Sequence, residues 1–123
     1  MHVVLVEDHH AVSVLVGQMI EVLGHTVQVF TTGTSAISWL RDRVRDHQPD
    51  VVITDHHLPD MTSATVIEEL RGETGIGIIV YTGTDIAPYA AHYGSQVVAL
   101  QKPFSIEQLA NALNWACPRT VSS

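Results

Sequence analysis

The sequence of 123 residues predicts an α/β fold, (βα)5, in which the five strands of one parallel sheet alternate with helices. Five short apolar segments recur along the chain, and each is bounded by polar or turn-forming residues. The intervals between them carry apolar residues three or four positions apart, which is the spacing of an amphipathic helix. Charged or hydroxyl side chains follow four of the apolar segments, at the ends where parallel sheets bind ligands.

The predicted strands are short runs rich in valine and isoleucine, and the central one is apolar without interruption over 51–53. Such a run is typical of a strand that is buried on both faces of a parallel sheet. The segment 25–30 alternates between apolar and polar residues, which also indicates a strand. The five predicted strands are 2–6, 25–30, 51–53, 78–81 and 97–100.

The first predicted helix has a stripe of apolar residues and ends at Gly24, a residue that commonly terminates helices. The spacing places Leu15 on the inward stripe. It places Val14 outside the stripe, on an outward face with Ser13 and Gly17. Because an apolar residue on a solvated face suggests a partner contact, we interpret Val14 as a candidate docking residue.

The other helices have recognisable ends. The last one begins with a capping box, in which the side chains of Ser105 and Gln108 satisfy each other's backbone N–H groups. The fourth, over 85–93, is expected to be short, because Pro88 fits only in its first turn. Trp39 and Trp115 are interpreted as packing residues rather than ligand platforms.

Composition and charge predict one domain over 1–118 and a polar tail over 119–123. The formal net charge of −7, from 6 basic and 13 acidic residues, argues against direct nucleic-acid binding. The single cysteine, Cys117, excludes an internal disulfide and suits a reducing compartment. Because no segment has the pattern of a membrane span or a signal peptide, we expect a cytoplasmic protein without a membrane partner.

The residues that follow the strands predict a site for phosphoryl chemistry. Glu7 and Asp8 follow the first strand, Asp55 the third, Thr82 the fourth and Lys102 the fifth. Crowded carboxylates repel one another and require a cation, and hard oxygen ligands favour Mg²⁺ over Zn²⁺. A metal-neutralised aspartate beside a lysine and a hydroxyl is suited to receiving a phosphoryl group, with Asp55 as the nucleophile.

In this pattern the sequence resembles the receiver domains of two-component response regulators, and the resemblance covers essentially the whole chain. Each matching motif is weak alone, but all occur in order at strand ends. They are Glu7-Asp8, Asp55 with Pro59, Thr82-Gly83 and Lys102-Pro103-Phe104. The resemblance implies a flavodoxin-like sheet of order 2-1-3-4-5. It also implies a phosphoryl acceptor that has at most self-phosphorylation and self-dephosphorylation activity, rather than an enzyme.

The resemblance further implies roles for individual residues. Asp55 would accept the phosphoryl group from a sensor histidine kinase or a phosphotransfer protein. Thr82 and Lys102 would bind the phosphoryl group, and Gly83 would leave room for it. The Mg²⁺ ligands would be Asp8, Asp55, the backbone carbonyl of His57 and, through water, Glu7. We expect a single-domain regulator whose downstream partner the sequence does not name.

Two features depart from the family pattern. Ala99 stands where family members usually carry a switch aromatic, and the interval from 82 to 102 is short. Four of the eight histidines fall at the predicted site: His9, His10, His56 and His57. We interpret them as polar loop residues, because adjacent histidines rarely aim both rings at one ion. A transition-metal or pH-sensing site is the alternative.

Two other functions are compatible with parts of the pattern. A non-phosphorylated interaction module in the same fold would explain Ala99, but not the complete set of acids, threonine and lysine. A phosphatase of the haloacid-dehalogenase type also uses an aspartate, Mg²⁺ and a lysine. It requires a second acid two residues after the nucleophile, where this chain has His57, and a cap domain that the sequence does not indicate.

Overall fold

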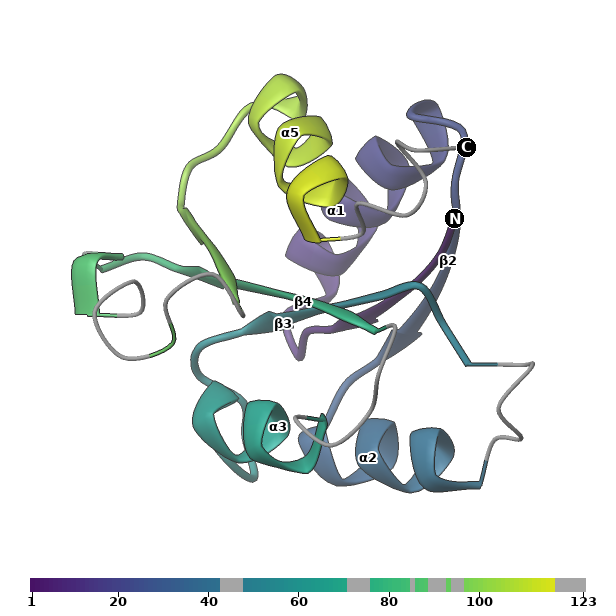
Figure 1. The fold of residues 1–123 in the computed structure, drawn as a ribbon, viewed down its shortest axis with the longest axis vertical. Helices are drawn as coiled ribbons and strands as arrows, with labels where there is room; N and C mark the ends of the chain where they lie inside the picture. Colours follow the sequence, from purple (N-terminus) through teal and green to yellow (C-terminus); the bar gives the residue numbers. More distant parts are fainter. Residues whose placement is uncertain (43–47, 71–75, 85, 89–92, 94–96, 117–123) are drawn as a thin grey trace.

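One sheet of five parallel strands runs through the middle of the molecule (Figure 1). The computed structural model describes residues 1–42, 48–70, 76–84, 86–88, 93 and 97–116. The strand order is β2-β1-β3-β4-β5, which confirms the predicted fold class and topology. The strands are β1 (His2–Val6), β2 (Thr26–Phe30), β3 (Val51–Asp55), β4 (Gly77–Thr82) and β5 (Val98–Gln101).

Helices cover both faces of the sheet (Figure 1): α1 and α5 lie on one side, and α2 and α3 on the other. Their bounds are α1 (His10–Val22), α2 (Gly33–Arg41), α3 (Ser63–Leu70) and α5 (Ile106–Ala116). The label α4 is unused, because the predicted helix over 85–93 falls mostly outside the described residues. Cys117 and the predicted tail lie outside them too. None of the described helices combines the length and the apolar composition that crossing a membrane requires.

The strands bury side chains on both faces, and alternate residues enter two separate cores. Val3 and Leu5 of β1 pack in the core under α1 and α5. Val4 and Val6 pack in the core over α2 and α3. The central strand β3 is buried along its whole length, as its continuous apolar run predicts.

The inward face of α1 differs from the predicted one. Leu15 is 59% exposed, so its predicted place in the core is wrong. The prediction that Ser13 and Gly17 face outward is also wrong, because both are buried. A β-carbon on Gly17 would sit at an ordinary 3.9 Å from Val27 Cγ1 of β2. The rotation of α1 that buries Ser13 and Gly17 leaves Leu15 towards solvent.

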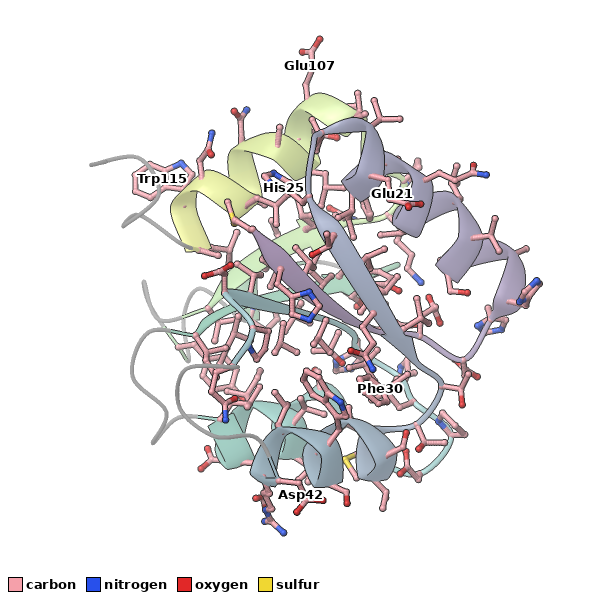
Figure 2. The ribbon with its side chains drawn as sticks, turned by 90° about the vertical axis from the view of Figure 1, so that its right-hand side faces the viewer. Glu21, His25, Phe30, Asp42, Glu107 and Trp115 are labelled. Atoms are coloured by element: carbon pink, nitrogen blue, oxygen red, sulfur yellow. The ribbon has the colours of Figure 1, made fainter. Side chains whose placement is uncertain are left out.

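The two tryptophans have different surroundings. Trp39 packs on Phe30, with 5.5 Å between the ring centroids, as predicted for a packing residue. Trp115 projects from the end of α5 and is 80% exposed, so its prediction as a packing residue is wrong (Figure 2). The last turn of an amphipathic helix has fewer neighbours than its middle. The spacing of apolar residues therefore does not predict that a residue in the last turn is exposed.

The loop after β3 is fastened to the start of α2. Asp60 accepts hydrogen bonds from the backbone N–H groups of Gly33, at 2.9 Å, and Thr34, at 2.8 Å. A carboxylate is favourable at a helix N-terminus, where free N–H groups carry partial positive charge. Hydrogen bonds, above all the one from the Thr34 hydroxyl, lower the pKa of Asp60 below its usual range. The loop that follows Asp55 is thereby tied to a neighbouring helix.

Candidate functional site

The predicted site residues converge at the carboxyl edge of the sheet. Asp55 is the last residue of β3 and Thr82 the last of β4, while Glu7 and Lys102 directly follow β1 and β5. The pairing of Val6 with Thr54 and of Asp55 with Tyr81 brings these ends into line. The predicted juxtaposition is therefore present, because all strands are parallel and end at one edge.

Three carboxylates and one imidazole form a compact cluster at this edge. Its members, each offering one ligand atom within 4.8 Å of the others, are Glu7, Asp8, His9 and Asp55. Glu7 is fully buried, Asp55 is 6% exposed, and Asp8 is open to solvent. Burying carboxylates is unfavourable unless cations or hydrogen-bond donors compensate their charge.

Lys102 supplies part of that compensation. Its ammonium nitrogen lies 3.4 Å from Asp55 Oδ2 and 3.9 Å from Glu7 Oε1. One ammonium group beside two members of a cluster of three carboxylates leaves an excess of negative charge. The donors beside it are carboxylate oxygens, the hard ligands that Mg²⁺ prefers, so the residues present fit a divalent cation of this kind.

The end of β4 forms a turn that engages the Thr82 hydroxyl. Thr82 Oγ1 lies 2.9 Å from Thr84 Oγ1 and accepts a hydrogen bond from the backbone N–H of Thr84 at 3.1 Å. Between them, Gly83 is exposed, and a β-carbon added there would meet no atom within 4 Å. The turn therefore leaves open space at Gly83, while the role of Gly83 in making room for a phosphoryl group stays a prediction.

The four histidines do not converge on one point. His9 Nδ1 lies 3.4 Å from Asp8 Oδ1, within the acidic cluster. His56 instead places its Nδ1 3.2 Å from Ser63 Oγ, at the start of α3, and its ring packs edge-on against His57. Burial, then the neighbouring His57, lowers the pKa of His56. The backbone N–H of His57 donates to Asp55 Oδ1 at 3.4 Å, while its role as a carbonyl ligand stays a prediction.

Tyr81 belongs to the same site, and the sequence-based prediction missed it. Its buried hydroxyl donates a hydrogen bond of 2.6 Å to Glu7 Oε1, and its ring lies under the Lys102 ammonium, 4.6 Å from nitrogen to centroid. A usable signal was present, because a tyrosine at the end of a buried strand needs a partner for its hydroxyl. Ala99 lies on β5 beside Val80, at the position without an aromatic.

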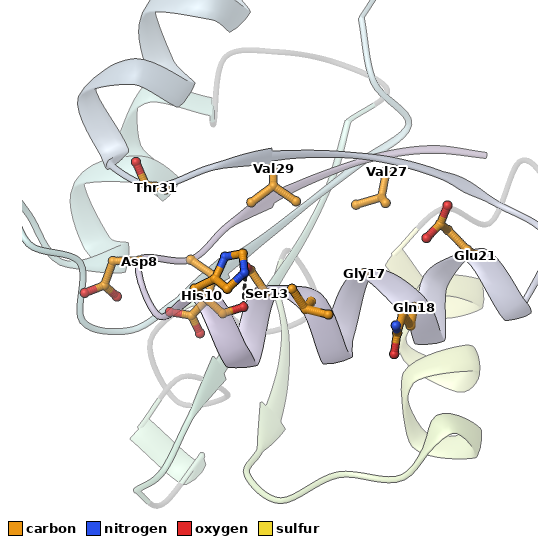
Figure 3. A pocket seen from close by; sticks show the side chains of 11 residues that line it. Asp8, His10, Ser13, Gly17, Gln18, Glu21, Val27, Val29 and Thr31 are labelled. Atoms are coloured by element: carbon orange, nitrogen blue, oxygen red, sulfur yellow. Dashed lines mark hydrogen bonds between the residues drawn. The ribbon is translucent and has the colours of Figure 1, made fainter.

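An open groove of about 450 Å³ begins at the acidic residues and follows α1 along β2 (Figure 3). Asp8 and His10 lie at its end near the site, Val29 lies near its middle, and Val14 is among the residues that line it. Ser13 and Gly17, although buried, line it as well. The groove thus joins an exposed apolar stretch to the carboxylate cluster.

Comparisons with known sequences identify one family. The chain matches the model of the response regulator receiver domain over residues 3–114. TcrX of Mycobacterium tuberculosis is 32% identical over 124 residues, covering 96% of this chain and 50% of TcrX. Transcription factor SKN7 of Saccharomyces cerevisiae is 32% identical over 117 residues, covering 91% of this chain and 18% of SKN7. The chain thus spans half or less of the length of these relatives.

Solved structures of low sequence identity share the fold. A response regulator receiver domain protein from Clostridium thermocellum superposes with a TM-score of 0.83 at 20% identity, covering 98% of this chain and 97% of that one. The receiver domain of a sensor histidine kinase from Pseudomonas aeruginosa PAO1 superposes with a TM-score of 0.77 at 21% identity. The match covers 99% of this chain and 98% of that one, whose active site cleft coordinates a magnesium ion.

Proposed function

The chain belongs to the response regulator receiver domain family, and from this premise we propose that it accepts a phosphoryl group on Asp55 from a phosphohistidine. The observation that carries the proposal is the contact of 3.4 Å between Lys102 Nζ and Asp55 Oδ2, inside a cluster of carboxylates. This arrangement holds a nearly buried nucleophile beside a fixed cation. The donor would be a sensor histidine kinase or a phosphotransfer protein.

Asp55 would act as the nucleophile of the transfer. One of its carboxylate oxygens forms a bond to phosphorus as the phosphorus–nitrogen bond of the donor breaks. The donor imidazole, already protonated on its other ring nitrogen, takes the electron pair of that bond and leaves as neutral imidazole. The Lys102 ammonium, 3.4 Å from the attacking carboxylate, is placed to neutralise a phosphoryl oxygen. Thr82 would donate a hydrogen bond to another oxygen, in the space that Gly83 leaves open.

Mg²⁺ is the cofactor that we propose for this site. Its ligands would be Asp8, Asp55, the backbone carbonyl of His57 and, through water, Glu7. When bound, the ion would neutralise the carboxylates and the incoming phosphoryl oxygens. The magnesium ion in the P. aeruginosa receiver domain supports this choice, as do the clustered carboxylate oxygens of this chain.

The proposal is tested by treating the protein with acetyl phosphate, a small phosphodonor, and measuring its intact mass. We expect one added phosphoryl group in the presence of Mg²⁺ and none when EDTA removes the ion. Labelling also separates the alternatives, because a non-phosphorylated interaction module would gain no mass under either condition. Unchanged labelling in EDTA would contradict the role of the metal.

Phosphorylation would be transmitted through the turn after β4. The Thr82 hydroxyl now lies 2.9 Å from the Thr84 hydroxyl, so a movement of Thr82 towards the phosphoryl oxygen would change the contacts of this turn. Ala99 has no side chain that could follow this movement, as an aromatic would. A ligand shifts a conformational equilibrium only through elements that differ between the two states. The turn from Thr82 to Thr84 is such an element.

Amide exchange should therefore report a small and local change on activation. With beryllofluoride, an analogue of the phosphoryl group, we expect altered protection in the loops after β3 and β4. Protection in β5 and α5 should change little, because Ala99 has no side chain that could transmit the movement of Thr82 to these elements. The measurement is hydrogen–deuterium exchange with mass spectrometry, with and without beryllofluoride and Mg²⁺. Large changes across β5 would show that this face switches by another route.

The groove along α1 is the surface that we propose for the phosphodonor protein. Val14 is 43% exposed, lines the groove and lies one to two turns from the acidic cluster. We expect Val14→Asp to slow transfer from the cognate kinase by about tenfold or more, the size of a moderate interface hot spot. Labelling by acetyl phosphate should stay unchanged, because this donor needs no docking surface.

Val22→Asp is the matched control for this prediction. Val22 is on the same helix and 76% exposed, but it lies at the end remote from the acidic cluster. Transfer rates from the kinase to both variants are compared by following loss of label from the phosphorylated kinase. Equal rates for Val14→Asp and the wild type would mean that Val14 is merely an exposed valine.

A further inference from the structure

Tyr81 stands between the acidic cluster and the core under α1 and α5, and none of the roles described so far requires its hydroxyl. The side chain is fully buried, and its oxygen lies 2.6 Å from Glu7 Oε1. Tyr81 pairs with Asp55 in the sheet, one residue before Thr82. Tyr81 therefore contacts the site from its buried side, away from solvent.

The hydrogen bonds of Glu7 show what the phenol supplies. Both carboxylate oxygens are occupied: Oε1 accepts from the Tyr81 hydroxyl, and Oε2 accepts from the backbone N–H of His9 at 3.2 Å. Glu7 is fully buried, so its charge depends on such donors. Of the two, the one from Tyr81 is shorter and comes from a side chain that substitution can remove.

The ring of Tyr81 makes two further contacts. The Lys102 ammonium lies over it at 4.6 Å from the centroid, while also facing Asp55 and Glu7. A cation over the face of an aromatic ring is attracted by the ring's electrons. The ring also packs edge-on against Phe104, with 5.9 Å between centroids. One side chain thus contacts both the buried acid and the lysine.

We propose that Tyr81 is a positioning residue of the metal and phosphoryl site: its hydroxyl orients Glu7 and its ring seats the Lys102 ammonium. This inference rests on the proposed function. Tyr81 touches neither the ion nor the phosphoryl group, and acts through the two residues it holds. Outer-shell partners that orient acidic ligands in this way typically change metal affinity by ~10–100-fold when they are removed.

The environment keeps the phenol a hydrogen-bond donor. Burial raises the pKa of Tyr81 far above its usual range, and the hydrogen bond to Glu7 adds to the shift. The hydroxyl, 2.6 Å from Glu7 Oε1, donates the hydrogen bond that this carboxylate oxygen accepts. A phenylalanine would preserve the ring contacts with Lys102 and Phe104 and remove the donor alone.

The first test measures Mg²⁺ binding to the whole chain by isothermal titration calorimetry. We expect Tyr81→Phe to weaken binding by ~10-fold or more, because Glu7 loses its orienting partner. Tyr93→Phe is the matched control: Tyr93 packs against the core on the opposite face of the sheet, so binding should be unchanged. Unchanged binding by Tyr81→Phe would overturn the inference.

A double-mutant cycle separates positioning from general weakening of the fold. If Tyr81 acts through Glu7, then Tyr81→Phe should have little further effect on Mg²⁺ affinity in a Glu7→Gln background. An equal loss in both backgrounds would overturn the positioning role. Absence of Mg²⁺ binding by the wild type would instead overturn the proposed function, and this inference with it. Failure of the inference about Tyr81 and failure of the proposed function would therefore give different results.

A measurement without substitution covers the case in which Tyr81→Phe does not fold. The protein is produced with 3-fluorotyrosine, and the three tyrosine signals are followed by fluorine NMR during an Mg²⁺ titration. We expect the Tyr81 signal to shift with the same midpoint as the calorimetric binding, because the charge on its partner Glu7 is being neutralised. A Tyr81 signal that stays in place while Mg²⁺ binds would overturn the inference.

Discussion

We expect Asp55→Asn to abolish phosphorylation by acetyl phosphate. The substitution keeps the size of the side chain but replaces the nucleophilic carboxylate with an amide, which cannot form the acyl phosphate. Asp55 is nearly buried and lies 3.4 Å from Lys102, closer than Glu7, which lies at 3.9 Å and whose Oε1 already accepts from the Tyr81 hydroxyl. Intact-protein mass spectrometry in Mg²⁺ should show the added group on the wild type alone.

Asp42→Asn is the matched control for this experiment. Asp42 caps the C-terminal end of α2, is exposed and lies outside the acidic cluster (Figure 2). The same change of aspartate to asparagine should leave its labelling equal to that of the wild type. If Asp55→Asn were labelled as strongly as Asp42→Asn, Asp55 would not be the acceptor and the proposed function would fail.

We expect Gly77→Ala, at the start of β4, to destabilise the protein more than Gly17→Ala, in α1. A β-carbon on Gly77 would lie 2.2 Å from the carbonyl oxygen of Ala116 and 2.7 Å from its carbonyl carbon. These are backbone atoms at the end of α5, so the helix itself would have to move. Overpacking of this kind costs ~1–3 kcal/mol in the free energy of unfolding, measured by urea denaturation.

Gly17→Ala provides the contrasting variant. Gly17 is in the interior of α1, and an added β-carbon would meet only Val27 Cγ1, at an ordinary 3.9 Å. Alanine favours helix over glycine by up to ~1 kcal/mol, so this variant should unfold at a higher urea concentration than the wild type. Equal midpoints for both variants would show that α5 moves away from Gly77 without cost.

Which helix faces turn inward was predictable only in part. The apolar residues of α3 at helical spacing, Val66, Ile67 and Leu70, are all buried, together with Ser63. In α1 the same reasoning placed Leu15 inside, because it counts apolar residues and ignores small ones. The rotation that buries Ser13 and Gly17 instead depends on how the helix packs against its neighbours, and hence on the shape of both elements.

The sequence alone determined the parallel fold and most of the candidate site. Strand-forming runs alternate with amphipathic segments, and parallel strands must end at one edge, so Asp55, Glu7, Thr82 and Lys102 were expected together. Local capping was equally readable, since Ser105 and Gln108 exchange the predicted hydrogen bonds, at 3.1 and 2.8 Å. These features follow from periodicity or from neighbours along the chain.

Only the tertiary structure decided how the site is supported. The bond between Tyr81 and Glu7 joins residues 74 positions apart, and that from Asp60 to Gly33 joins residues 27 apart. Each depends on the register between strands and on the path of a loop, which no local pattern encodes. The parallel topology places the charged groups at the strand ends close together, while packing across the sheet determines which hydrogen-bond partners they have.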